Sequence, residues 1–171
     1  MTSASEVDTL NVFVQHSVHI GCPIEAVRTT LAAGPREWFP RFDGDGHAEV
    51  GPQVAGLGFR KKVAIEVGEA VTVGDWTEIP VTWQATFVQD LFPVMTGKVE
   101  LEAVDPRITR LTVSGMYDAP LGRLGKQLDD ALMHRAAEAT VKELAESIAK
   151  RLEIGLSDEG LSALKQSTNG F

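Results

Sequence analysis

The 171-residue sequence contains a single cysteine, Cys22, which excludes a disulfide within the chain and a zinc site built from cysteines. Basic residues are also few, with 16 Lys and Arg against 24 Asp and Glu and a formal net charge of -8. A phosphate-binding surface needs a basic patch, and the only cluster of bases is Arg60, Lys61 and Lys62. We therefore expect no nucleic-acid partner and interpret these three bases as a solvated strand edge.

Long apolar runs and catalytic motifs are missing as well. No stretch approaches the roughly 18 apolar residues of a membrane-spanning helix, and residues 1–8 lack the apolar core of a signal peptide. These absences predict a cytoplasmic protein without integral membrane association. There is no nucleophile elbow, no HExxH and no phosphate-cradling glycine loop, and the acidic loop at 43–46 lacks the closing glutamate of a calcium-binding loop. We expect no metal and no cofactor.

The length and a hydrophobic content of 43% suit one domain with a real core. We assign residues 1–9 to a flexible N-terminus, 10–153 to a single domain and 154–171 to a C-terminal tail. Within the tail, Ser157 is placed to cap a short helix, and residues 166–170 are typical of disorder.

The first strand is predicted at 10–20, where valine and isoleucine alternate with more polar residues and His16 falls on the apolar side. Two short helices open at Pro23 and Pro35. Six closely spaced strands follow at about 47–51, 58–67, 69–77, 81–90, 94–104 and 108–117, which favours an antiparallel meander. One alternate set on these strands is apolar and is predicted to face the core: Val63, Ile65, Val67, Val71, Val73, Trp83, Ala85, Phe87, Met95, Val99, Leu101, Leu111 and Val113.

A long helix is predicted from about 119 to 153, with Asp118 as its N-cap. Its second half carries an apolar stripe formed by Ala137, Val141, Leu144, Ile148 and Leu152. In the first half the pattern reverses, because the continuation of this face carries Arg123, Lys126, Asp130 and His134. Two alternatives follow: the helix is kinked near 130–136, which Gly122 and Gly125 would permit, or its polar groups line a cavity.

The motifs that carry a family resemblance are the segments 18–27 (VHIGCPIEAV), 38–40 (WFP), 57–59 (LGF) and 120–124 (PLGRL). In their order and spacing they resemble the START and birch-pollen-allergen (SRPBCC) superfamily, in particular its polyketide cyclase/dehydratase-like branch. The resemblance covers roughly residues 10–153. It implies an α+β helix-grip fold, in which a curved seven-stranded antiparallel sheet with two short helices grips a long C-terminal helix. It also implies an apolar cavity, but no particular reaction, because this fold hosts carriers, sensors, cyclases and co-chaperones.

A cavity is also expected on physical grounds, since one helix about 10 Å across is too narrow to fill a wide curved sheet. We predict a hydrophobic ligand between Trp83, Phe87, Met95, Val113 and Met133, with its polar end near His16, His134 or Tyr117. The plainer alternatives are a buried, hydrogen-bonded His16, an exposed His134 and ordinary core aromatics and methionines. Cys22 is expected to be structural rather than reactive.

Two classes of function remain open. The first is a non-catalytic carrier, sensor or sequestering protein for a lipid, polyketide or similar molecule, and it is the one that we favour. The second is a cyclase- or dehydratase-like enzyme with a proton shuttle drawn from His16, Asp130, His134 and Tyr117. A protein-interaction module is the third alternative, and the sequence does not choose between a monomer and a homodimer.

Overall fold

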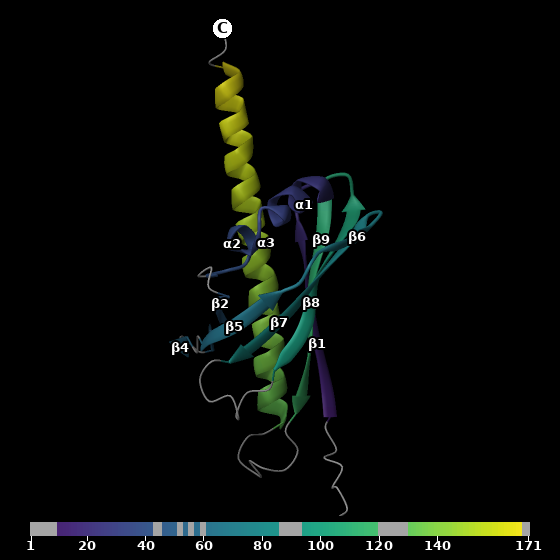
Figure 1. Cartoon of the computed structure of the whole chain (residues 1–171), viewed down its shortest axis with the longest axis vertical. Helices are drawn as coiled ribbons and strands as arrows, with labels where there is room; N and C mark the ends of the chain where they lie inside the picture. Colours follow the sequence, from purple (N-terminus) through teal and green to yellow (C-terminus); the bar gives the residue numbers. More distant parts are fainter. Residues whose placement is uncertain are drawn as a thin grey trace, which may run out of the picture.

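The computed structural model describes residues 10–42, 46–50, 53–54, 57–58, 61–85, 94–119 and 130–168. Figure 1 shows a twisted sheet with one long helix running along it and two short helices near the middle of that helix. The elements, in chain order, are β1 (Leu10–Ile20), α1 (Ile24–Ala32), α2 (Pro35–Trp38), β2 (His47–Val50), β3 (Gln53–Val54), β4 (Leu57–Gly58), β5 (Lys61–Val67), β6 (Val71–Val73), β7 (Trp76–Ala85), β8 (Met95–Asp105), β9 (Ile108–Ala119) and α3 (Asp130–Thr168).

The main sheet is antiparallel and seven-stranded, in the order β1-β9-β8-β7-β5-β2, with β6 paired to β7. Strands β3 and β4 form a separate two-stranded sheet. The first strand therefore lies beside the last one, and the strands between them follow as a meander. The predicted fold class, an α+β fold with a seven-stranded antiparallel sheet, two short helices and a long C-terminal helix, is confirmed.

We call the side of the main sheet that packs against α3 its inner face. The alternation predicted for β1 is confirmed, because Val14 and Ile20 are buried on this face while Phe13 and Gln15 are exposed on the other. The same holds for most of the other predicted core positions. The predicted core residues that are buried on β5, β7, β8 and β9 are Val63, Ile65, Trp83, Met95, Val99, Leu101, Leu111 and Val113.

The prediction was wrong for β6, where Val71 and Val73 are 55% and 67% exposed. The pairing register places them beside Glu78 and Trp76 of β7, on the outer face. This strand has three residues and pairs with β7 alone, so an apolar alternate pattern there does not reflect burial.

The break predicted between the strands at 69–77 and 81–90 is also wrong, because β7 runs from Trp76 straight through Pro80. The backbone N–H of Gly68 donates to the carbonyl of Pro80 at 2.8 Å. The carbonyl of Pro80 therefore points to the edge of β7 that faces the end of β5. In a strand the N–H and C=O of one residue point to the same edge, and hence the missing N–H of Pro80 removes no hydrogen bond from the pairing with β8.

The apolar stripe predicted for the long helix is confirmed for Val141, Leu144, Ile148 and Leu152, which are buried, and its first residue, Ala137, is half-buried. Through this face α3 packs mainly against β1 and β9, and it also contacts α1 and α2. Its predicted start was wrong in part, because Asp118 and Ala119 belong to β9. The predicted kink region at 130–136 lies within α3, which runs as one helix from Asp130. The residues at 120–129, which include both glycines and the first polar residues of the reversed face, lie outside the described residues.

The helix also differs at its other end, since α3 continues to Thr168 instead of ending near Glu153. No proline interrupts this stretch, and the single Gly155 costs only about 1 kcal/mol relative to alanine. Ser157 does not cap a new helix: its hydroxyl donates to the carbonyl of Glu153 at 2.7 Å, one turn back in the same helix. In Figure 1 the C-terminal end of α3 extends past the sheet and past α1 and α2.

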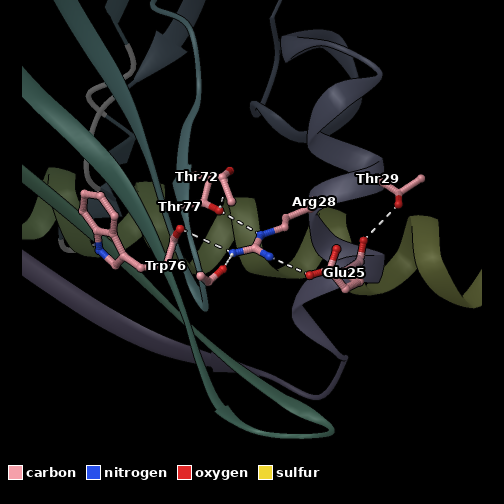
Figure 2. A network of polar contacts seen from close by, with 7 residues as sticks. Glu25, Arg28, Thr29, Thr72, Trp76 and Thr77 are labelled. Atoms are coloured by element: carbon pink, nitrogen blue, oxygen red, sulfur yellow. Dashed lines mark hydrogen bonds and ion pairs between the residues drawn. The ribbon is translucent and has the colours of Figure 1, made fainter.

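Arg28 joins α1 to the hairpin of β6 and β7. Its guanidinium donates to the carbonyl of Gly74 at 2.6 Å and to the hydroxyl of Thr77 at 2.9 Å, and it pairs with Glu25 at 2.6 Å. Figure 2 shows the guanidinium between the helix and the hairpin, with Thr72 hydrogen-bonded to Thr77 beyond it. This contact fixes α1 against one end of the sheet.

A second joint holds α2 against the long helix. The guanidinium of Arg151 on α3 donates to the carbonyls of Arg36 and Glu37 at 2.8 and 3.3 Å. Both carbonyls lie at the C-terminal end of α2, where the carbonyls of a helix lack partners within it. Trp38 and Phe39 are buried beside this joint and meet edge to face, with ring centres 5.6 Å apart. The joints made by Arg28 and Arg151 keep the short helices in place over the sheet.

Because the side chains of Leu144 and Ile148 are buried, Leu144→Ala and Ile148→Ala should each lower the free energy of unfolding by about 2 to 5 kcal/mol. Glu146→Ala, on the exposed face of the same helix, should change it by less than about 0.5 kcal/mol. Denaturant melts of the three variants measure this difference. Values below about 1 kcal/mol for both core variants would mean that this face of α3 does not carry the packing.

Candidate ligand-binding site

The strand register arranges the inner face in rows that run across the strands. The first row contains Ile65, Trp83, Met95, Tyr117 and Val12; the second contains Val67, Val81, Gly97, Gly115 and Val14; the third contains Ile79, Val99, Val113 and His16. Apart from His16 and the tip of Tyr117, the side chains of these rows are apolar. The predicted lining residues Trp83, Met95 and Val113 therefore share one face of the sheet. The helix α3 packs on this face where it is formed by β1 and β9.

The middle row contains a pair of facing glycines, Gly97 on β8 and Gly115 on β9. A methyl group added to Gly115 would lie 3.1 Å from the terminal carbon of Met95 and 3.2 Å from the indole ring of Trp83. A methyl group on Gly97 would overlap the carbonyl oxygen of Ser114. The side chains of Trp83 and Met95 thus lean from the first row toward Gly115 in the second, and a larger residue at Gly115 would displace them. At Gly97 a side chain is excluded by the backbone of the neighbouring strand.

Sequence reasoning missed this glycine pair, although a signal was present. Gly97 lies between Met95 and Val99, and Gly115 lies two residues after Val113, so each glycine interrupts an apolar alternate set. When two glycines face each other on paired strands, they indicate a place where another group can approach the backbone closely.

The polar candidates on the sheet do not converge. His16 is half-buried and faces Val113, whereas Tyr117 is buried and lies four residues further along β9. At about 3.3 Å per residue this separation is about 13 Å, and side chains stand roughly perpendicular to a sheet. The two side chains therefore meet different ends of anything that lies between them.

The candidates on the helix are only partly described. His134 lies seven residues before Val141, on the same face of α3, but its side chain is 45% exposed and lies 3.3 Å from Glu138 one turn on. This agrees with the plainer interpretation of His134 as a surface residue. Asp130 and Met133 belong to the first turn of α3, and their side chains lie outside what the structure describes, as does Phe87.

The part of the chain that the structure describes holds no group of three or more His, Cys, Asp or Glu side chains arranged to bind a metal ion. Among the same residues, no helix is long and apolar enough to cross a membrane. Cys22 is half-buried, and burial together with the negative charge of Glu153 raises the pKa of its thiol. A raised pKa keeps the thiol protonated, which opposes a nucleophilic role.

The chain combines three features of one known architecture: an antiparallel sheet that begins with β1, two short helices that follow this strand, and a long terminal helix packed on the inner face. The chain has the helix-grip fold. The fold that the resemblance in the sequence implied is therefore confirmed. The sequence matches no protein-family model and no curated protein.

Solved structures with a similar fold include the Zhui aromatase/cyclase from a Streptomyces species, at 16% identity over 86% of this chain and 94% of that chain, with a TM-score of 0.48. A conserved protein from Geobacillus kaustophilus is 14% identical over 87% of this chain and 96% of its own, with a TM-score of 0.48. Norcoclaurine synthase from Thalictrum flavum is 14% identical over 88% and 95%, with a TM-score of 0.41. At these identities the similarity concerns the fold alone.

Because the pKa of the Cys22 thiol is raised, its alkylation by iodoacetamide should follow a pH profile whose midpoint lies above the ordinary thiol value, and it should be slow at neutral pH. Glu153→Gln removes the second cause and should speed the reaction modestly, whereas Glu146→Gln on the same helix should not. A rate that is already maximal near neutral pH would contradict this assignment.

Proposed function

We propose that the protein binds a hydrophobic small molecule between the inner face of the sheet and α3, and acts as a carrier, sensor or sequestering protein. The observation that carries this proposal is the row formed by Trp83, Met95 and Tyr117, which lies beside the bare backbone of Gly97 and Gly115. An apolar wall with a few separated polar groups is the usual composition of a small-molecule site.

The energetics divide the work between these groups. Burial of apolar area contributes about 25 cal/mol per Å², so the apolar surface that the ligand covers supplies most of the affinity. A hydrogen bond from His16 or Tyr117 adds only about 0.5 to 1.5 kcal/mol and mainly fixes the orientation of the ligand. Lipids, polyketides and similar molecules with one polar end suit this arrangement.

An acid/base enzyme of the cyclase or dehydratase type receives less support. Such a reaction needs a general acid and a general base within hydrogen-bond reach of neighbouring atoms of the substrate. Among the described residues, His16 and Tyr117 are separated along β9, and His134 is engaged at the helix surface with Glu138. We therefore retain binding, rather than catalysis, as the proposed function.

A charge on the inner face should abolish binding, because it must be desolvated when the apolar ligand enters. We expect Trp83→Glu to lose saturable binding of the neutral fluorescent probe N-phenyl-1-naphthylamine. Trp76→Glu is the matched control, since Trp76 lies on the same strand but faces the other side of the sheet. Probe titrations of the two variants and the unmodified protein test the placement of the site.

Circular dichroism melts first establish that the variants are folded, and Trp83→Gln replaces Trp83→Glu if the charged variant is not. Loss of binding in the Trp83 variant with retention in the Trp76 variant is the expected result. Binding that survives in folded Trp83→Glu, or its absence from the unmodified protein, would overturn the proposed site.

The polar end of the ligand should affect affinity much less than the lining does. His16→Ala is expected to leave the dissociation constant of the probe within about tenfold, a limit of about 1.4 kcal/mol. Tyr117→Phe removes only a hydroxyl and should remain within the same limit. Isothermal titration of both variants tests this, and a loss larger than about a hundredfold in either would mean that a polar contact dominates binding.

A further inference from the structure

We propose that the bare backbone of Gly97 and Gly115 is the floor of the ligand site, and that Trp83 and Met95 cover it until a flat, fused-ring apolar ligand moves them aside. This inference rests on the proposed function and specifies both the position and the ligand class of that site. The term glycine floor is used below for the inner surface of these two residues.

The glycine floor is the one place in the three described rows where two neighbouring strands present no side chain to the inner face. Larger side chains surround it on each side, among them Val81 and Val14 in its own row. The space above Gly115 is filled by atoms that belong to the next row, the indole edge of Trp83 and the terminal methyl group of Met95. At Gly97 the nearest atoms are backbone atoms of Ser114 and Gly115 on the neighbouring strand. The Gly115 half of the floor is thus covered by side chains from another row and not by its own residues.

Both covering side chains are placed to move. Methionine has three rotatable side-chain bonds and adapts readily to changes in packing. Met95 is the first residue of β8, and Trp83 lies two residues before the end of β7, so both are at one end of the sheet. They are also slightly accessible, at 9% and 5% exposed, whereas Val99 and Leu101 deeper in β8 are almost completely buried.

The shape of the floor selects the class of ligand. The edge of an indole, itself a flat fused ring, already occupies the space that a side chain on Gly115 would need. A flat fused ring can take over this contact with little loss of conformational entropy, while a flexible chain must give up many rotamers to do so. The floor lies between Tyr117 and His16, about 7 Å along the strands from each, so a hydroxyl at one end of the ring meets one of them.

The test uses two ligands with the same number of carbons and one hydroxyl each, the flat 2-naphthol and the flexible decan-1-ol. Trp83→Ala removes the larger cover, so it should raise the affinity for 2-naphthol by at least about threefold and raise that for decan-1-ol less. Gly115→Ala added to Trp83→Ala should cancel the gain, because the new methyl group occupies the floor. Leu101→Ala, which opens space elsewhere on the inner face, should give no such gain.

Each alternative result has a definite meaning, with melts confirming that the variants are folded and Met95→Ala standing in for Trp83→Ala if that variant is not. If the unmodified protein binds 2-naphthol but Trp83→Ala binds it no better, the glycine floor is not the site and the proposed function stands. An equal gain for both ligands overturns the preference for flat rings. If neither the unmodified protein nor Trp83→Ala binds either ligand, both this inference and the proposed function fail.

Discussion

The packing of one face of α3 against β1 and β9 is the contact on which the rest of the structure depends. Val141, Leu144, Ile148 and Leu152 are buried in it, and it joins the last element of the chain to the first strand and the last strand of the sheet. Without the helix, the apolar inner face of both strands would be exposed to water, at a cost of about 25 cal/mol for each Å².

The width of the helix limits how much of the sheet it covers. An α-helix is about 10 to 12 Å across with its side chains, and neighbouring strands are about 4.8 Å apart, so α3 spans little more than two strands. The inner faces of β5, β7 and β8 must be covered in other ways. Trp83 of β7 and Met95 of β8 turn toward Gly115 on the neighbouring strand β9. In the site that we propose, an apolar ligand takes the place of these two side chains.

The sequence predicted what depends on local periodicity. The alternation of β1 and the stripe of α3 persist over many residues, so their buried sides were identified correctly. Other features depend on which strands lie next to each other, and the alternation within one segment does not show this. Val71 and Val73 alternate like core residues but belong to a short edge strand, and Pro80 reads as a turn although its missing N–H falls where no partner strand needs it.

The candidate site was predictable to a similar extent. Trp83, Met95 and Val113 share the inner face because alternate residues of their strands point to the same side, as the pattern predicted. The distance between His16 and Tyr117 follows from the register of β1 and β9, which the sequence of a single strand does not reveal.

Native mass spectrometry of the freshly purified protein, followed by extraction, tests the central claim most directly. The account predicts one apolar molecule per chain that organic solvent removes. Folded protein that carries no ligand and takes up none from a mixture of apolar compounds would contradict it.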